Sequence, residues 1–139
     1  CSVRRQRQMC IRDSFNSAHK LANNSWSKEK NFDVFGKCSY ENYHGHNYEL
    51  IVKLTGDIDP ETGMLMDLSI LKKIIKKEVE DVLDHKNLNL DIPYFKDLIP
   101  STENLAIFIW NRLKDAIDIE CELSIVLYET PRNFVEYSG

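Results

Sequence analysis

The sequence predicts an α+β domain in which an antiparallel sheet carries helices on one face. Segments in the middle and at the end of the chain alternate apolar and polar residues, as half-buried strands do. Two segments between them repeat apolar residues at helical spacing. Strands and helices do not alternate regularly, which disfavours a parallel sheet built from βαβ units and favours the α+β class.

The length and composition indicate a single globular domain. The chain has 139 residues, enough for one domain with its own core. Residues 1–12 show no apolar period and no initiating methionine, so we expect a non-native or disordered appendage there and one domain over residues 13–139. Part of a first strand could also lie within residues 1–12. The cysteines, at positions 1, 10, 38 and 121, form no CxxC pair, which favours reduced thiols in a cytoplasmic protein.

Charge and hydropathy exclude two classes of partner. The formal net charge is −4, which argues against a protein that neutralises phosphate backbones, so we expect no nucleic-acid partner. No apolar run approaches the roughly 20 residues that a membrane span needs. We therefore expect no membrane partner either.

The first elements of the domain follow in order along the chain. A strand is expected from Tyr48 onward, or from slightly before it, because apolar and polar residues alternate there. The turn-rich segment 55–63 ends this strand. Residues 67–83 then place apolar side chains at helical spacing with lysines outside, and Asp67 or Ser69 is available as the N-cap.

A second helix and a hairpin complete the predicted domain. Ser101 or Thr102, followed by Glu103, resembles a capped helix start, and apolar residues over 105–117 form one stripe. A core-facing stripe explains these residues better than a cofactor-binding segment. The pattern over 121–138 predicts two strands joined by a "TPRN" turn.

Two of the four histidines lie two residues apart in the stretch "CSYENYHGHNY". If the strand begins before Tyr48, its period of two points His44 and His46 to the same side of the sheet. With His19 as a third donor, they could form a catalytic zinc site whose fourth position is open to water or substrate. The spacing alone also fits two histidines in a surface loop, and this alternative stays open.

Three further places could carry chemistry. Cys38 lies in a polar loop six positions before His44, where a cation would favour the thiolate, although most free cysteines are inert buried residues. Asp84 could orient His85 and raise its basicity, although such a pair is also common at a helix end. Glu129 ends a strand at a turn. If buried, it could accept two hydrogen bonds from a heterocycle; if exposed, it is simply solvated.

Six segments, in order from about Phe15 to the end, resemble the family of 6-pyruvoyltetrahydropterin and 6-carboxytetrahydropterin synthases. They are "FNSAHKL", "FGKCSYENYHGHNYEL", "GMLMDLSILK", "LDHKNLNLDIPYF", "STENLAIFIW" and "VLYET". The resemblance implies a tunnelling fold, with a four-stranded antiparallel sheet and two helices on one face. It also implies that the sheets of three subunits form a barrel, that two trimers form a homohexamer, and that active sites lie at subunit interfaces.

The resemblance assigns roles to the candidate residues. It implies three zinc ligands, a general base with two proton-relay partners, and three groups that bind the pterin. These are, in turn, His19, His44 and His46; Cys38 with Asp84 and His85; and Glu129 with Thr102 and Glu103. Glu129 is the expected anchor, at the edge of the pterin that the zinc does not touch.

The implied activity is that of a zinc-dependent carbon–oxygen lyase. It converts 7,8-dihydroneopterin triphosphate to 6-pyruvoyltetrahydropterin and eliminates triphosphate, as in tetrahydrobiopterin synthesis. The spacing C-x5-HGH favours this product, because the 6-carboxytetrahydropterin synthases of the queuosine pathway usually resemble C-x3-HGH. That second activity, which releases acetaldehyde and triphosphate, is the alternative product.

Two further points qualify the resemblance. A protein of a different class, a non-catalytic module in which Cys38 completes a structural zinc site, is the second alternative. The family's common "CNNPNGHGHNY" is also changed here, because Tyr43 places a bulky group beside the metal. The fit of the substrate's side chain depends on this position.

Overall fold

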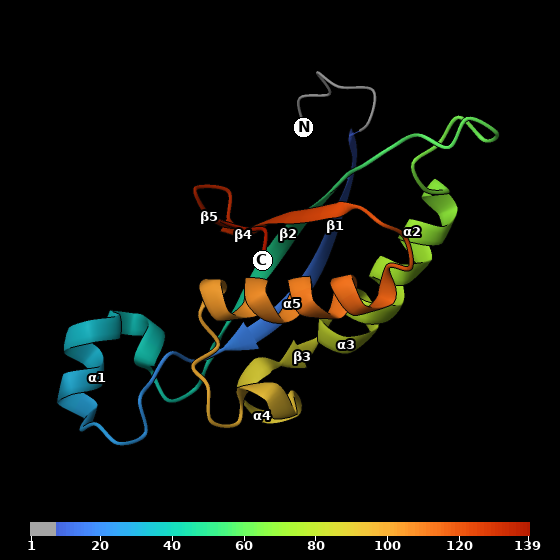
Figure 1. The fold of residues 1–139 in the computed structure, drawn as a ribbon. Coiled ribbons are helices and arrows are strands. Elements are labelled where there is room, and N and C mark those ends of the chain that lie inside the picture. Colours follow the sequence, from blue (N-terminus) through green and yellow to red (C-terminus); the bar gives the residue numbers. More distant parts are fainter. Residues whose placement is uncertain (1–7) are drawn as a thin grey trace.

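A computed structural model describes residues 8–139, and their strands form one sheet (Figure 1). The order across the sheet is β3-β1-β2-β4-β5. The strands are β1 (Gln8–His19), β2 (His44–Thr55), β3 (Lys86–Asn87), β4 (Glu122–Thr130) and β5 (Asn133–Tyr137). Neighbours pair antiparallel except β3, which runs parallel to β1. The predicted α+β class is confirmed. The resemblance implied four strands; the additional strand is β3, which was not predicted because its two residues are too few to show a periodicity.

β1 begins earlier than the predicted domain boundary. Each of its residues is paired with β2, from Gln8 opposite Thr55 to His19 opposite His44. Residues 8–12, which the sequence analysis grouped with an appendage, are therefore part of the sheet. The alternation is hard to see because polar residues such as Asp13 lie on both faces of the strand. The rest of the expected appendage, residues 1–7, lies outside the described residues.

The two predicted helices lie on one face of the sheet (Figure 1). The first consists of α2 (Leu68–Ile75), a π-helical turn (Lys76–Glu80) and α3 (Asp81–Leu83). The second is α5 (Thr102–Ala116). The side chains of Asp67 and Ser101 accept hydrogen bonds from the first-turn N–H groups of α2 and α5, as N-caps do.

Shorter helical segments were not predicted, because they are too short to show a period. They are α1 (Lys28–Phe35), α4 (Leu88–Asp91) and the 3-10 turns Gly36–Ser39 and Pro93–Phe95. In Figure 1, α1 lies beyond the ends of β1 and β2, away from the other helices. None of the helices over residues 8–139 has the length and apolar character that crossing a bilayer demands.

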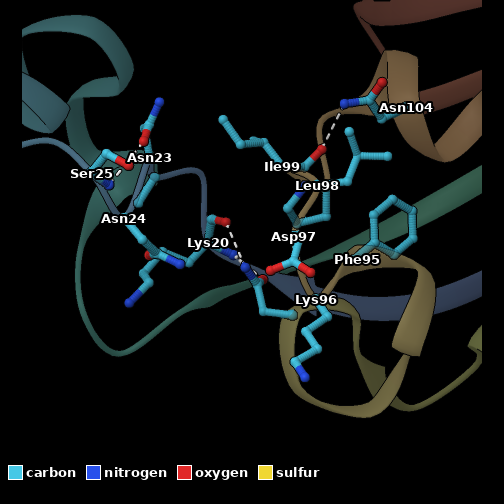
Figure 2. A pocket seen from close by; sticks show the side chains of 13 residues that line it. Lys20, Asn23, Asn24, Ser25, Phe95, Lys96, Asp97, Leu98, Ile99 and Asn104 are labelled. Carbon is cyan, nitrogen blue, oxygen red and sulfur yellow. Dashed lines mark hydrogen bonds between the residues drawn. The ribbon is translucent and has the colours of Figure 1, made fainter.

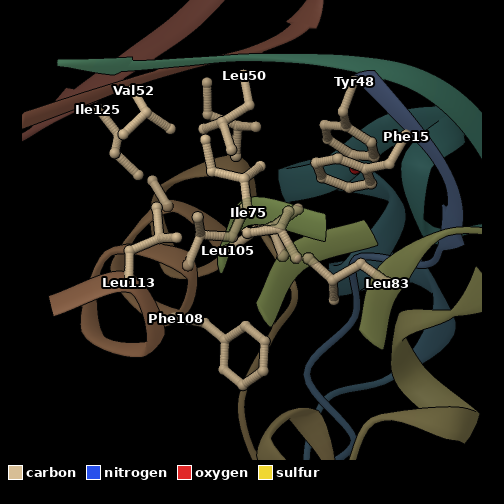
Figure 3. Packing of buried hydrophobic residues seen from close by; sticks show 14 of the residues in the cluster. Phe15, Tyr48, Leu50, Val52, Ile75, Leu83, Leu105, Phe108, Leu113 and Ile125 are labelled. Atoms are coloured by element: carbon tan, nitrogen blue, oxygen red, sulfur yellow. The ribbon is translucent and has the colours of Figure 1, made fainter. Parts of the chain in front are cut away.

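The core lies between the sheet and the helices (Figure 3). Leu50 and Val52 of β2 point toward Leu105 and Leu113 of α5, and all four are fully buried. Toward the other end of the core, Phe15 and Tyr48 stack with ring centroids 5.1 Å apart. This apolar packing fixes the ends of β1 and β2, which carry the histidines.

Among the cysteines of residues 8–139, one differs from the prediction. Cys38 and Cys121 are free thiols, but Cys10 is disulfide-bonded. The expectation of reduced thiols throughout is therefore wrong at Cys10. Spacing along the chain does not show which cysteines come within bonding distance in the fold.

Candidate metal centre and active site

Three histidine rings meet on the helix-covered face, where β1 ends and β2 begins. His19 is paired with His44 in the antiparallel register, and His46 lies opposite Ser17. The ring centroids are 4.6 Å apart for His19 and His44, 5.0 Å for His19 and His46, and 4.9 Å for His44 and His46. One ligand atom from each ring lies within 4.8 Å of the other two. The period of two along β2 and the pairing with β1 create this cluster.

Each ring offers one nitrogen to a cation. The Nδ1 atom of His19 lies 2.8 Å from the carbonyl oxygen of Pro100, and donation of its proton there leaves a lone pair on Nε2. The Nε2 atoms of His19, His44 and His46 are buried and have no hydrogen-bond partner among the described residues. Such atoms are unfavourable unless something binds them. The three side chains fit a divalent metal with an open coordination position.

The protonation state of the cluster also suits a metal. Burial lowers the pKa of His44, and the neighbouring His19 and His46 lower it further, while Glu129 opposes the shift. Burial likewise lowers the pKa of His46, against the charge of Glu129. Since only a neutral imidazole binds metal, both ligands are available at neutral pH without releasing a proton.

We expect the affinity for zinc to be nearly constant from about pH 8 down to about pH 6.5, the ordinary histidine pKa, and to fall only below it. The reason is that the pKa values of His44 and His46 are depressed, so their protonation begins to compete only at lower pH. Competition titrations with a chelator, corrected for its own protonation, measure this. A steady fall in affinity between about pH 8 and about pH 7 would contradict the expectation.

Glu129 brings a carboxylate to the same cluster. Its Oε1 atom lies 3.4 Å from Nε2 of His19 and 3.4 Å from Nε2 of His46. The imidazole of His19, with smaller effects from His46 and the Thr102 hydroxyl, holds the pKa of this carboxyl below its usual value although burial opposes the shift. The sequence analysis expected Glu129 at the pterin edge away from the metal. That role stays a prediction; in the single chain, β4 pairs with β2 and so brings the carboxylate beside the histidines.

The start of α5 places one of the two other predicted binding residues at this site. Thr102, the first residue of α5, is buried, and its hydroxyl helps to lower the pKa of the Glu129 carboxyl. Glu103 is exposed to solvent. The structure therefore brings Thr102 to the cluster and leaves Glu103 on the surface of the single chain.

Cys38 lies beside the cluster in the 3-10 turn Gly36–Ser39. Its carbonyl oxygen accepts a hydrogen bond from the Leu21 N–H at 2.8 Å, which ties the turn to the chain just after His19. Burial raises the pKa of the Cys38 thiol, and the negative charge of Glu129 raises it further. The sequence analysis expected a cation to lower this pKa, whereas the neighbouring charge within the chain is an anion. A thiolate here depends on a positive charge bound at the site.

Comparison with known proteins shows which family has this arrangement. The family described as 6-pyruvoyl tetrahydropterin synthase matches residues 8–139, the same residues that the structure describes. A human 6-pyruvoyl tetrahydrobiopterin synthase is 43% identical over 134 residues, which cover 96% of this chain and 92% of the relative. The chain belongs to the 6-pyruvoyl tetrahydropterin synthase family.

Two other comparisons bear on the fold and the product. The structure of a 6-pyruvoyl tetrahydropterin synthase from Caenorhabditis elegans superposes with a TM-score of 0.89 at 39% identity, covering 95% of this chain and 94% of that one. The predicted subunit fold is thereby confirmed. A 6-carboxy-5,6,7,8-tetrahydropterin synthase from Haemophilus influenzae is 34% identical over 142 residues, 80% of this chain and 96% of the relative.

The relay residues expected from the synthase family lie elsewhere in the single chain. Asp84 follows α3 and accepts a hydrogen bond from the Asn16 N–H at 2.8 Å. This hydrogen bond, together with one from the His85 side chain, lowers the pKa of Asp84. The Nδ1 atom of His85 lies 2.9 Å from Asp84 Oδ2, but its side chain is 84% exposed. Within residues 8–139, neither makes a hydrogen bond or ion pair with Cys38 or the histidine cluster. One chain therefore does not assemble the whole set.

Two buried residues on the strand face of the histidine cluster were missed. The Tyr48 hydroxyl lies 3.4 Å from Nδ1 of His19, and burial raises its pKa strongly. Ser17 is 3% exposed, and its hydroxyl donates to the Leu83 carbonyl at 2.5 Å. Both share the strand face of the histidines, so parity along β1 and β2 could have pointed to them.

Proposed function

We propose that this chain is a zinc-dependent 6-pyruvoyltetrahydropterin synthase, a carbon–oxygen lyase acting on 7,8-dihydroneopterin triphosphate. The observation that carries the proposal is the convergence of three buried histidine nitrogens that make no hydrogen bond within residues 8–139, with the free Cys38 beside them. The human relative, 43% identical, bears the name of this activity. Zinc is the proposed metal because three imidazoles and an open position suit it.

The proposed chemistry is a set of proton transfers. When bound, a divalent ion supplies the positive charge that acidifies C–H and O–H bonds of a diol beside it. Cys38 accepts the carbon-bound proton of the substrate's side chain, and Asp84 with His85 returns protons at other atoms. The side chain is thereby oxidised and the ring reduced, without a nicotinamide. Triphosphate leaves by elimination.

Glu129 and Thr102 are the proposed pterin-binding groups. A carboxylate accepts two parallel hydrogen bonds from the amino group and ring N–H of a pterin. The position of Thr102 supports this role, because its buried hydroxyl lies close enough to the Glu129 carboxyl to lower the pKa of that group. Glu103, exposed in the single chain, stays a further candidate.

We further propose the homohexamer of two trimers, with the active site between subunits. Two observations support it. The side chain of His85 is exposed and separate from Cys38. Nearby apolar side chains are also exposed, with Leu90 at 69%, Tyr94 at 44% and Leu98 at 38%. A stable monomer in light scattering at micromolar concentration, with normal turnover in an activity assay, would contradict the assembly. A cytoplasmic location also belongs to the proposal: the free thiols of Cys38 and Cys121 favour a reducing compartment, whereas the disulfide at Cys10 does not.

Mass spectrometry of the products tests the activity directly. The zinc-loaded protein is incubated with 7,8-dihydroneopterin triphosphate, and we expect 6-pyruvoyltetrahydropterin and triphosphate. The second candidate is the carboxypterin synthase, which the 34% identical relative from H. influenzae favours. Formation of 6-carboxytetrahydropterin with acetaldehyde would establish that reaction instead, and no conversion would overturn both.

We expect Ser17→Ala to lower turnover about tenfold while zinc content and KM stay unchanged. The Ser17 hydroxyl holds the Leu83 carbonyl, directly before the proposed relay of Asp84 and His85, so its loss loosens that pair. A shifted pH profile of kcat should accompany the loss. The control is Ser14→Ala, an exposed serine on the opposite face of β1. Equal rates for the two variants would show that Ser17 does not position the relay.

A further inference from the structure

Lys20 is held rigidly between the metal cluster and the proposed base. Its N–H donates to Asn89 Oδ1 at 2.8 Å, and its carbonyl accepts from Asn89 Nδ2 at 3.0 Å. On one side it follows His19, and on the other Leu21 is bonded to the Cys38 carbonyl. Three hydrogen bonds therefore fix the backbone here: two join Lys20 to Asn89, and one joins Leu21 to Cys38.

The charge of Lys20 is not neutralised by a carboxylate in the described part of the chain. Its Nζ atom lies instead over the ring of Tyr43, 5.2 Å from the centroid. A cation–π contact of this kind positions an ammonium group and leaves its full charge available to an anion. Lys20 thus presents a fixed, uncompensated positive charge one residue from a metal-ligand candidate.

Tyr43 adopts a backbone conformation that disfavours a bulky side chain. Its φ angle is 62°, in the left-handed region, and within residues 8–139 only His85 shares this feature among non-glycine residues. Strained conformations persist where the surroundings enforce them, and they concentrate at functional sites. Here Tyr43 directly precedes His44 in β2, and its ring lies beneath the Lys20 ammonium group.

A cavity of about 410 Å³ adjoins this lysine (Figure 2). It lies between the loop 20–25 and the segment 95–100. Lys20 and Lys96 line it together with asparagine side chains, against the single carboxylate of Asp97. Pro100, whose carbonyl bonds to His19, also lines the cavity, so it adjoins the metal cluster.

We infer that Lys20, seated on Tyr43, binds the phosphate groups of a polyphosphate ester and the triphosphate released from it. This inference rests on the proposed function. The phosphates of such a substrate are attached to the same short side chain whose hydroxyls would bind at the metal site. The residue that binds the phosphates must therefore lie close to the metal ligands. Lys20 meets this requirement. Its ammonium offers three donors to phosphate oxygens.

The test measures the binding of inorganic triphosphate to the zinc-loaded protein by calorimetry. We expect Lys20→Gln to weaken binding by roughly tenfold, the loss expected for one charged partner, and Lys20→Arg to retain most of it. The KM for the triphosphate substrate should rise in proportion, while the affinity for an unphosphorylated pterin stays constant. Zinc is assayed after each titration because triphosphate chelates metals.

A matched control separates this role from a general loss of charge. Lys30 also lies over an aromatic ring, that of Trp26, with its Nζ 4.3 Å from the centroid. We expect Lys30→Gln to bind triphosphate as the wild type does. Tyr43→Gly relieves the left-handed strain, so it should keep the melting temperature yet weaken triphosphate binding about threefold.

The outcomes distinguish this inference from the proposed function. If the wild type does not convert the substrate, the proposed function fails. If the wild type fails to bind triphosphate, or if Lys20→Gln and Lys30→Gln bind it equally, the inference fails even when turnover is normal. Should Lys20→Gln not fold, an unchanged affinity in Tyr43→Gly or a lack of salt dependence in the wild type overturns the inference.

Discussion

Cys38→Ala is expected to reduce turnover at least about a thousandfold, within the range that a positioned proton-transfer group contributes. Zinc content and melting temperature should stay nearly unchanged. The three histidine nitrogens remain in place, and the deleted thiol is small and only partly buried. Steady-state rates, metal analysis and calorimetry on the same preparation measure the three quantities.

The matched control is Cys121→Ala. Cys121 is the other free and partly buried thiol, and burial raises its pKa as it does that of Cys38. We expect this variant to keep full activity. If Cys38→Ala loses its zinc, then Cys38 is a ligand, and the alternative of a structural zinc module replaces the catalytic one.

Glu129→Gln is expected to weaken pterin binding by roughly 2 kcal/mol, the order found when a charged hydrogen-bonded partner is removed. Glutamine keeps the shape of the side chain but loses its charge and one acceptor. Zinc should be retained, because all three imidazoles remain. Titration with a non-reactive pterin that lacks the phosphorylated side chain isolates binding of the ring. Some fall in turnover should accompany the loss, since binding energy also orients the reacting end.

The position of Glu129 makes this experiment informative in two directions. Glu122→Gln, an exposed substitution at the start of the same strand, is the control and should leave the affinity unchanged. If Glu129→Gln binds the pterin equally well, Glu103 becomes the next candidate for the anchor. If the variant loses zinc, the 3.4 Å approach to His19 and His46 reports a fourth ligand, and the anchor role fails.

Local patterns predicted the parts of the fold that depend on local chemistry. The alternation after Tyr48 located β2, whose parity placed His44 and His46 on one face. The N-caps Asp67 and Ser101 located the two main helices. These predictions hold because a strand's period and a helix cap are properties of a few consecutive residues.

Features that depend on tertiary packing were not predicted from the sequence. The pairing partner of β1 lies more than twenty residues away, so five of its residues were grouped with an appendage. Glu129 meets His19 only because β4 lies beside β2, which no spacing in the chain reveals. The separation of His85 from Cys38 is also a tertiary feature, which only the folded chain shows.

The π-helical turn at residues 76–80 sets the rotational phase of the helix that leads to Asp84. Buried residues follow at intervals of four: Leu71, Ile75, Val79 and Leu83. In a regular α-helix each interval of four drifts by about 40° around the axis, so this row would leave the sheet within three steps. The wider π turn absorbs part of that drift. Removing one residue from it would leave an intact helix whose last turn is rotated by about 100°. The helix could then still fold, while the acid and imidazole that follow it faced a different direction.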